Sequence, residues 1–500
     1  MPEASTRQVS IVGAGLGGIS AALSLALEGY RVTILEKNDK IGGKLNWLSA
    51  DGYQFDLGPS ILTLPHIFER TFQKAGKRME DYVPMCTVRP HWRNIFEDGA
   101  VIDLYPEPQR MAEEAARAGE SPAAVEQFLA YSGALYDLIN RGYFEHGLDS
   151  VSDFQSFYGL MEFMKFDLLR NMHQGVARRL RTPHFRDIFD FFIKYVGSSA
   201  YRAPAFLNCM ATIQFRYDLW YVPGGMYGLA RGLERLIREL GIEIRLNSEV
   251  QEIQRSPDGR RVTGLRLVGG DVLPCETVVS NLEVIPTHRR LLKTSENELA
   301  RMQRKLEPAC SGLVIDLGLD CKYENLAHHN FFFSRNQREH FHTVFQDHLL
   351  PEDPTLYVVV ASRTDPTVAP AGCDCLKILP HIPYLRPDRP VTHEMYVALK
   401  DRVLQKMERM GCTDLRRHIV FEHFWTPHDI ERNYYSNGGS IYGVVSDRFK
   451  NLAFKAARKS DHCEGLYFVG GSVNPGGGMP MVFQCGQNVA RLIVERDHGR

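Results

Sequence analysis

The sequence predicts an α/β protein, because the pattern strand–glycine turn–helix occurs near both ends of the chain. Residues 9–29 read as an apolar strand, a glycine turn and an apolar helix, and residues 466–493 repeat that order with a longer glycine loop. In each unit the helix N-terminus presents free backbone N–H groups, which favour an anionic ligand. The two units together predict one nucleotide-type ligand that both ends of the chain hold.

The first unit has the glycine spacing of a dinucleotide site, Gly13-x-Gly15-x-x-Gly18. Gly13 permits the tight turn, Gly15 lets the backbone approach the phosphates, and Gly18 lets the helix pack against the strand. A second strand follows and ends at Glu36, an acidic residue placed to bind ribose hydroxyl groups. Strand, turn, helix, strand and acid therefore all occur in the order that a dinucleotide-binding βαβ unit requires.

The segment Ile41–Lys44 favours FAD over NAD. A Gly-Gly pair followed by a basic residue, just beyond Glu36, resembles the second phosphate-contacting segment of FAD enzymes of the glutathione-reductase type. Most of those relatives carry Arg where this chain has Lys44. Lysine can still contact phosphate, but it cannot form the bidentate fork of a guanidinium group.

The middle of the chain contains an aromatic insertion between residues 154 and 195. One set of apolar residues falls at helical spacing and predicts a single helix face: Phe157, Leu160, Met161, Met164 and Leu168. A second cluster follows among basic residues: Phe185, Ile188, Phe189, Phe191, Phe192 and Tyr195. The insertion is either a buried helical cap or a lid that lines an apolar tunnel and touches lipid, and the two are compatible.

After the insertion the chain returns to the nucleotide-binding domain. Tyr221–Leu240 opens an amphipathic helix, and strands are expected at 242–246, 249–253, 262–267 and 272–280. We therefore predict a discontinuous FAD domain formed by residues 1–100, 221–300 and 421–500. The mixed-sheet and helical substrate domain comprises residues 101–220, with the lid, and 301–420.

Bulk composition excludes several classes of function. The chain has 500 residues, 44% of them hydrophobic, and a formal net charge of -1, which gives no reason to expect nucleic acid as a partner. The 10 cysteines are scattered, so neither a metal site nor a disulfide framework is expected. The first strand begins too early to leave room for a signal peptide, and we expect a reducing compartment.

The order of the motifs over nearly the whole chain resembles the carotenoid desaturases of the bacterial phytoene desaturase type. The segments that carry the resemblance are Val9–Glu36, Ile41–Lys44, Leu57–Ser60, Tyr221–Leu240, Val278–Asn281, Ser362–Pro366 and Leu466–Pro480. The resemblance implies an amine-oxidase-like architecture, bound FAD and a long isoprenoid polyene as substrate. It also implies that Glu36 binds the adenosine ribose, that the Val250 backbone contacts adenine, and that the Asn474–Met479 loop lies beside the isoalloxazine.

Within that family, Asn437–Gly443 and Gly471–Pro480 look most like the diapocarotenoid oxidases, which convert terminal methyl groups of C30 carotenoids to aldehydes. Desaturases more often have His where this chain has Asn474, and a phytoene or diapophytoene desaturase is the alternative. Two readings from other classes remain: a flavin amine oxidase, and a non-enzymatic isoprenoid-binding escort protein. The Phe- and Met-rich insertion argues against the former and the complete set of FAD motifs against the latter.

These patterns define a set of predicted cofactor-binding residues and leave the catalytic side chains unassigned. The set is Gly13, Gly15, Leu16, Gly18, Glu36, Lys37, Gly43, Lys44, Gly58, Pro59, Ser60, Val250, Gly471, Asn474, Gly477, Gly478 and Met479. Oxidation of a polyene needs a hydride acceptor in an apolar channel, which flavin supplies. We expect a quinone or O2 to reoxidise it, and a cytoplasmic protein held peripherally on the inner face of the cell membrane.

Overall fold

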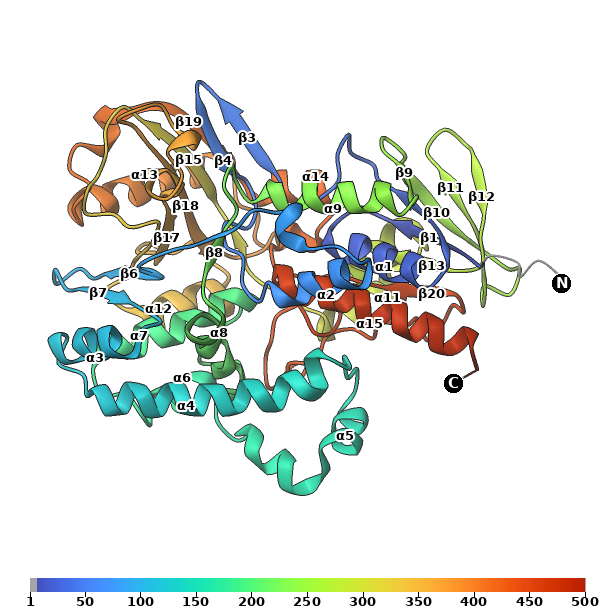
Figure 1. Cartoon of the computed structure of the whole chain (residues 1–500), viewed down its shortest axis with the longest axis horizontal. Helices are drawn as coiled ribbons and strands as arrows, with labels where there is room; N and C mark the ends of the chain where they lie inside the picture. The colour runs from blue at the N-terminus through green and yellow to red at the C-terminus, as the bar shows by residue number, and fades with distance from the viewer. Residues whose placement is uncertain (1–6, 500) are drawn as a thin grey trace.

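A five-stranded parallel sheet carries the glycine-rich segments from both ends of the chain. The computed structural model describes residues 7–499 and gives this sheet the order β20-β13-β1-β2-β9 (Figure 1). Its strands are β1 (Gln8–Val12), β2 (Arg31–Leu35), β9 (Glu243–Arg245), β13 (Val278–Ser280) and β20 (Leu466–Phe468). All neighbouring pairs are parallel, so the carboxyl ends of the strands share one edge, where ligands bind in such sheets.

Two helices leave that edge and pack against each other. α1 (Leu16–Leu27) follows β1, and α15 (Met479–Asp497) follows β20. Their backbones approach closely, since a Cβ atom at Gly486 of α15 would lie 2.5 Å from the carbonyl oxygen of Gly17 in α1. Only a residue without a side chain fits at this contact, which joins the N-terminal and C-terminal parts into one unit.

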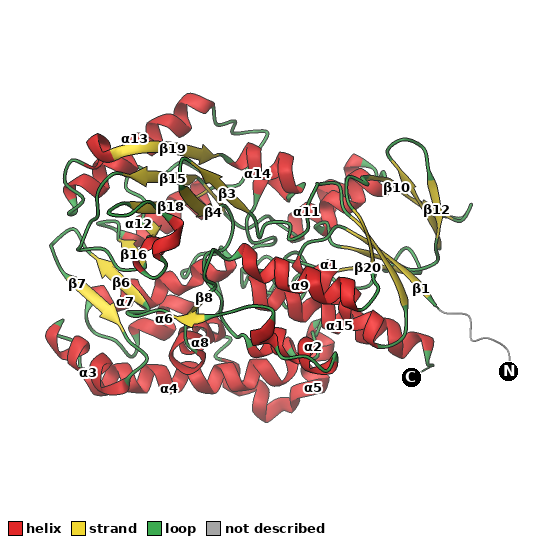
Figure 2. Ribbon diagram, turned by 45° about the horizontal axis from the view of Figure 1, so that its top comes forward, coloured by secondary structure: helices red, strands yellow, loops and turns green. Residues whose placement is uncertain are grey.

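A second, mostly antiparallel sheet forms the other half of the molecule (Figure 2). Its order is β19-β15-β18-β17-β16-β6-β7, with β14 (Ser311–Gly312) also paired to β18. The strands are β6 (Trp92–Ile95), β7 (Val101–Leu104), β15 (Val314–Leu319), β16 (His329–Phe332), β17 (Leu356–Val359), β18 (Asp374–Ile382) and β19 (Ile419–Trp425). β6 lies before residue 100 and β19 continues past residue 420, so this sheet also takes strands from outside 101–220 and 301–420.

Smaller sheets flank the two large ones. β10 (Val250–Arg255), β11 (Val262–Leu267) and β12 (Val272–Pro274) form an antiparallel sheet; β3 (Trp47–Ala50) pairs with β4 (Tyr53–Asp56), and β5 (Cys86–Thr87) with β8 (Trp220–Tyr221). The strand predicted over 272–280 is wrong as one element. The chain leaves β12 and enters β13 of the parallel sheet, so two strands of different sheets replace it.

Helices of residues 108–217, a segment that includes the aromatic insertion, cover the lower side of the molecule in Figure 1. They are α3 (Pro108–Arg117), α4 (Pro122–Ile139), α5 (Val151–Phe163), α6 (Met172–Ala177), α7 (Pro183–Phe191) and α8 (Cys209–Tyr217). The second aromatic cluster is confirmed as core, because α7 buries Phe185, Ile188 and Phe189. Within residues 7–499 no helix is both long and apolar enough to cross a membrane.

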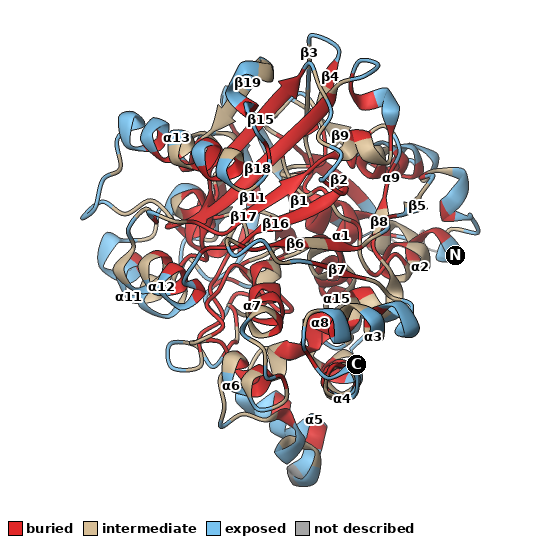
Figure 3. Ribbon diagram, turned by 90° about the vertical axis from the view of Figure 1, so that its left-hand side faces the viewer, coloured by how far each residue is buried: buried red, intermediate tan, exposed pale blue. Residues whose placement is uncertain are grey.

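The single helix face predicted from Phe157 to Leu168 is wrong. α5 contains a break at Gly159, where φ is 61° and ψ is 168°, and a left-handed turn follows at Asp167. The break reverses the faces: Phe154 and Phe166 are buried, whereas Met161 and Met164 are exposed. Much of α5 is coloured as exposed in Figure 3. The Leu160 side chain lies outside the described part of the structure.

The remaining helices lie around the two large sheets. They include α2 (His66–Lys74), α9 (Tyr227–Glu239), α11 (Glu296–Lys305), α12 (Gln337–His342), α13 (His393–Arg409) and α14 (Pro427–Tyr434). The predicted amphipathic helix at 221–240 is confirmed, since α9 buries Leu229, Leu233 and Leu236.

A buried carboxylate connects β4 to the start of α9. Asp56 Oδ1 accepts a hydrogen bond of 2.8 Å from the Met226 N–H, at the positive end of the helix. Burial raises the pKa of Asp56 to about 6, although the nearby Lys377 ammonium opposes that shift. Lys377 in turn donates to Ser60 Oγ over 3.1 Å and to the Gly58 carbonyl oxygen, so it connects β18 to the segment that follows β4.

We expect the Asp56→Asn variant to lose part of the protein's pH-dependent stability. A pKa raised in the folded state gives stability that is present below about pH 4 and lost as pH rises through about 6. Between pH 4 and pH 7 the stability of wild type should therefore fall relative to that of Asp56→Asn, by roughly 1 to 3 kcal/mol. Urea unfolding at several pH values measures this, with the exposed Asp51→Asn as control. Parallel profiles for wild type and Asp56→Asn would contradict the assignment.

Candidate functional site

A long cavity of about 350 Å³ lies at the carboxyl edge of the parallel sheet and continues to the second sheet. Nearly all the predicted cofactor residues line it: Gly13, Gly15, Leu16, Glu36, Lys37, Gly43, Lys44, Gly58, Pro59, Ser60, Val250, Gly471, Gly477, Gly478 and Met479. Gly18 and Asn474 do not line it. The structure thus gathers residues from four distant parts of the chain around a single space.

One end of the cavity presents an acidic side chain beside a polar, partly aromatic rim. Glu36 is buried; its Oε2 accepts a 2.7 Å hydrogen bond from the Ala14 N–H, and its Oε1 accepts one of 2.9 Å from the Asn38 N–H. Each carboxylate oxygen keeps a further lone pair for a hydroxyl donor. Lys37 Nζ lies 4.3 Å from the ring centre of Tyr435, which also lines this end.

The middle of the cavity is bounded by bare backbone. Gly42 N–H donates to the Ala14 carbonyl over 2.8 Å, and a Cβ atom on Gly43 would lie 3.0 Å from the Gly15 Cα. Asn281, which directly follows β13 and also lines the cavity, accepts a hydrogen bond of 3.0 Å from the Gly18 N–H and supports the turn. Glycine at these positions leaves room for a ligand against the N-terminus of α1, where an anion is stabilised.

Lys44 makes contacts within the protein in addition to lining the cavity. Its Nζ donates to the Ser440 carbonyl oxygen over 2.8 Å and lies 3.4 Å from Glu283 Oε1. Burial raises the pKa of Glu283, while Lys44 lowers it. The side chain thus connects the Gly42-Gly43 segment to the Ser440 loop, where it also donates to the Ile441 carbonyl oxygen over 3.5 Å.

The other end of the cavity combines the C-terminal glycine loop with a hydroxyl-bearing aromatic wall. Gly477 packs against the Tyr442 backbone so closely that a Cβ atom there would lie within 2.4 Å of the Tyr442 carbonyl oxygen. Tyr195, Tyr357 and Tyr442 all line this end, and we call these three residues the tyrosine wall. Val314, Leu379, Trp425 and Ile441 add apolar surface, and Lys377 adds a buried amine.

Sequence reasoning missed the tyrosine wall and Lys377. Tyr357 and Lys377 lie on strands of the second sheet and Tyr442 in a loop. Tyr195, which the sequence placed only in the second aromatic cluster, lies in the helical turn after α7, and no spacing rule joins the four residues. The one local signal is Lys377, a lysine within the otherwise apolar run Leu376–Leu379 of the fully buried strand β18. A buried amine of that kind indicates a specific environment, since lysine is rarely buried without a partner.

Asn474 lies behind the glycine loop and connects it to the helical insertion. Its Oδ1 accepts hydrogen bonds from the Tyr143 hydroxyl over 2.6 Å and from the Lys455 N–H over 3.1 Å. Its Nδ2 donates to the Leu148 carbonyl over 3.0 Å. The side chain is fully buried. Its contacts are therefore with the protein, and it positions the loop rather than facing the cavity.

These residues fit FAD. An acidic side chain suits ribose hydroxyls, the bare amides at α1 suit a pyrophosphate, and the second glycine loop at the start of α15 suits the polar edge of an isoalloxazine ring. A Cβ atom at Gly43 or Gly477 would collide with neighbouring backbone atoms. These loops therefore pack as closely against their neighbours as glycine allows. Glu36, Gly15, Gly43 and Gly477 are thus the residues that would hold the cofactor.

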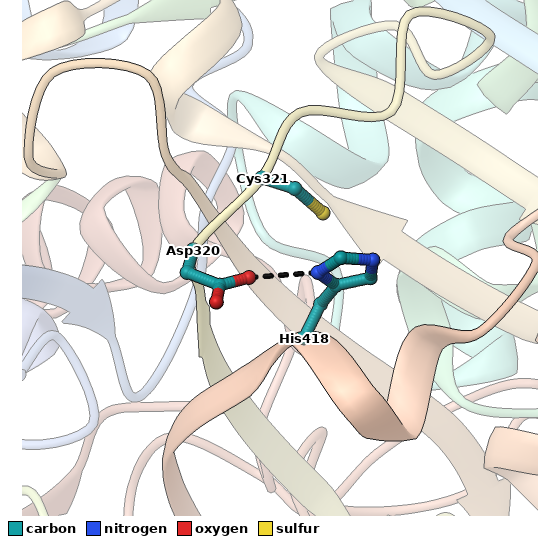
Figure 4. Close-up of side chains that lie close together, drawn as sticks. All are labelled: Asp320, Cys321 and His418. Atoms are coloured by element: carbon teal, nitrogen blue, oxygen red, sulfur yellow. Dashed lines mark hydrogen bonds and ion pairs between the residues drawn. The ribbon is translucent and has the colours of Figure 1, made fainter.

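A separate group lies on the surface of the second sheet (Figure 4). Asp320, Cys321 and His418 place one donor atom each within 4.8 Å of one another. His418 Nδ1 is 2.8 Å from Asp320 Oδ1; Asp320 is exposed and His418 is half-buried. An ordinary surface ion pair accounts for this proximity.

Comparison with known proteins agrees with this geometry. The family model described as flavin containing amine oxidoreductase matches residues 16–359. The chain is 56% identical to a 4,4'-diapolycopene oxygenase of Methylomonas sp, over 99% of both chains. It is 45% identical to a 4,4'-diaponeurosporene oxygenase of Staphylococcus aureus (strain USA300), over 98% of this chain and 99% of that one. The predicted resemblance to the diapocarotenoid oxidases is confirmed.

Solved structures support the predicted fold alone. A putrescine oxidase bound to putrescine superposes with a TM-score of 0.65 at 14% identity, covering 98% of this chain and 99% of that one. An oxidoreductase from Methanosarcina mazei gives a TM-score of 0.63 at 15% identity, covering 98% and 100%. From its family match, its full-length relatives and the geometry of its cofactor cavity, the chain belongs to the flavin-containing amine oxidoreductase family.

Proposed function

We propose that this chain is an FAD-dependent oxidoreductase that oxidises terminal methyl groups of a C30 diapocarotenoid to aldehydes. The observation that carries this proposal is the 56% identity, over essentially full length, to a protein named 4,4'-diapolycopene oxygenase. The chemistry of the cavity supports it. The end that meets the C-terminal glycine loop is lined by apolar side chains such as Val314, Leu379 and Trp425, which suit a hydrocarbon chain.

The alternative functions have less support. A desaturase is the alternative within the family, but both sets of relatives at 45% identity or more are named oxygenases. The amine oxidases resemble this chain in fold, but an identity of 14% is too low to infer a shared substrate. An escort protein would not need the two glycine loops packed against a cavity. We include reoxidation by a quinone or O2 in the proposal.

In this function the protein positions the substrate and excludes water. Bound FAD supplies a two-electron acceptor. The Gly471–Gly478 loop presents backbone N–H groups where negative charge would develop. The tyrosine wall faces that loop across the cavity and confines a chain end there. Since a polyene has no polar handle, orientation in a dry channel is the main contribution that the protein can make.

We further propose that α5 and its neighbours lie on the inner face of the cell membrane. Met161, Met164 and Leu169 are 79%, 75% and 92% exposed, and Phe449 and Leu452 are exposed beside them. Apolar side chains gathered in this way mark an interaction surface. Exposed Lys165 lies among them, as expected at the level of lipid headgroups.

A second cavity opens beneath this surface. It measures about 420 Å³ and is lined mainly by aromatic and aliphatic side chains, among them Phe154, Phe166, Phe206 and Phe454. Tyr143 lines it and donates its hydroxyl hydrogen bond to Asn474 of the cofactor-side loop. A hydrophobic substrate that dissolves in the bilayer would enter the protein on this side.

The first prediction concerns the product. We expect that expression in a carotenoid-free bacterial host that makes a C30 polyene yields pigment with oxygen at its ends, because terminal methyl groups are converted to aldehydes. Mass spectrometry of the extracted pigment measures this, with Glu36→Ala as the matched negative control. Pigment that is lighter by pairs of hydrogens and carries no oxygen would establish a desaturase in place of the proposed oxidase.

The second prediction concerns the cofactor. We expect Glu36→Ala to weaken FAD binding roughly 10- to 100-fold, because it removes a charge-assisted hydrogen bond to ribose as well as the Ala14 contact. Titration of the apoprotein with FAD, followed by fluorescence, gives the affinity. Glu243→Ala is the control, since Glu243 lies on the adjacent strand and bonds Thr33 outside the cavity. Equal affinities in the two variants would exclude a role for Glu36.

The third prediction concerns the membrane. Met164→Glu combined with Leu169→Glu should at least halve the protein that floats with phosphatidylcholine–phosphatidylglycerol vesicles, because two charges replace exposed apolar side chains. Val420→Glu is the control, an apolar residue that is 55% exposed on β19, which lies at the opposite end of the molecule from α5 in Figures 1 and 3. Unchanged flotation of the double variant would rule out this surface.

A further inference from the structure

Four buried nitrogen atoms lie behind the tyrosine wall without a hydrogen-bond partner among residues 7–499. They are Lys194 Nζ, Gln214 Nε2, His329 Nε2 and His381 Nε2. All four side chains are buried, the most exposed of them, Lys194, at 5%. Buried polar atoms in proteins are nearly always paired, so several in one place require an explanation.

Aromatic rings connect this group to the cavity. Lys194 Nζ lies 3.4 Å from the ring centre of Trp92 and 3.7 Å from that of Phe331. It is also 4.9 Å from the ring of Tyr357 and 5.0 Å from the ring of Tyr195. Tyr195 and Tyr357 line the cavity. The amine is therefore one aromatic ring away from the space where we place the substrate.

Tyr357 provides the direct contact between the two. Its hydroxyl lies 3.1 Å from His329 Nδ1, which fixes the phenol in one orientation. A tyrosine hydroxyl can donate one hydrogen bond and accept others, so it retains capacity for an atom in the cavity. Trp92 packs 5.0 Å from the His329 ring, centre to centre, and prevents the imidazole from moving away.

Burial favours the neutral form of each basic side chain in this group. Burial places the pKa of Lys194 well below its ordinary value, and burial together with the nearby charges of His328, Lys194 and His91 does the same for His329. Neutral amine and imidazole groups suit a hydroxyl or carbonyl oxygen. They suit a carboxylate less, because a full charge costs more to bury, and Lys377, which lines this end of the cavity, already donates to Ser60 and to the Gly58 carbonyl.

We propose that Tyr357, with His329 and Lys194 behind it, forms a subsite for the oxygen of a chain end that is already an alcohol or an aldehyde. This inference rests on the proposed function, since oxidation of a methyl group to an aldehyde passes through the alcohol. Tyr357 touches the oxygen, and His329 and Lys194 are positioning residues. The subsite retains the half-oxidised end at the redox end of the cavity and disfavours a carboxylic acid end.

Binding measurements test this without turnover. The flavin-loaded protein is titrated in detergent micelles with a C30 polyene hydrocarbon, its terminal alcohol and its terminal carboxylic acid, and the polyene absorbance is followed. We expect Tyr357→Phe to weaken binding of the alcohol roughly 5- to 20-fold and to leave binding of the hydrocarbon within about twofold. Wild type should bind the alcohol more tightly than the acid. Tyr396→Phe, which removes a phenol hydroxyl in α13 outside the cavity, is the control.

A second pair of variants covers the case in which Tyr357→Phe does not fold. His329→Leu should raise KM for the alcohol with little change in kcat, and His329→Gln, which keeps a polar atom for Tyr357, should restore most of it. Flavin content should match wild type in all variants. Equal weakening of alcohol and hydrocarbon, or no weakening of either, would overturn the subsite.

The two proposals fail in different ways. If wild type gives only a desaturated hydrocarbon in the bacterial host while alcohol binding still depends on Tyr357, the proposed function fails and the subsite stands. If wild type adds oxygen to the chain ends but alcohol binding is indifferent to Tyr357 and His329, the subsite alone is wrong.

Discussion

The close approach of α1 and α15 is the contact on which the site depends. Gly17 and Gly486 bring the two helix backbones together, and no larger residue fits at Gly486 without displacing the Gly17 carbonyl. Because both helices begin at the edge of the parallel sheet, this packing sets the separation of the two glycine loops. The distance between Glu36, which suits a ribose, and the C-terminal glycine loop therefore depends on the contact between α1 and α15.

The parts of the site that the sequence could predict are local ones. Gly13, Gly15 and Glu36 belong to one βαβ unit whose spacing is fixed by the length of a strand and a helix. The tyrosine wall has no such rule, because Tyr195, Tyr357 and Tyr442 meet only after the second sheet has formed. Periodicity failed at α5 for a related reason: Gly159 adopts a positive φ and redirects the helix, and one glycine in an apolar run gives no warning of that.

Asn474 belongs to a loop that was predicted correctly, but its side chain has a different role from the one expected. The loop that contains it does reach the cavity, through Gly471, Gly477 and Gly478, while its own side chain faces the helical insertion. Its bonds to Tyr143 and Leu148 join the segment between α4 and α5 to the C-terminal glycine loop. Movement of that segment would therefore be transmitted to the loop through the buried Asn474 side chain. The sequence alone could not have assigned this role to Asn474.

The cavity wall also constrains how the protein is made. Its lining begins at Val12 and ends at Val482, so the space is incomplete until almost the whole chain has left the ribosome. The N-terminal βαβ unit emerges first and must wait for α15 to cover it. The complete cavity therefore forms only when synthesis is nearly finished, and a chain that ended before α15 would lack Met479, Pro480 and Val482 from the lining.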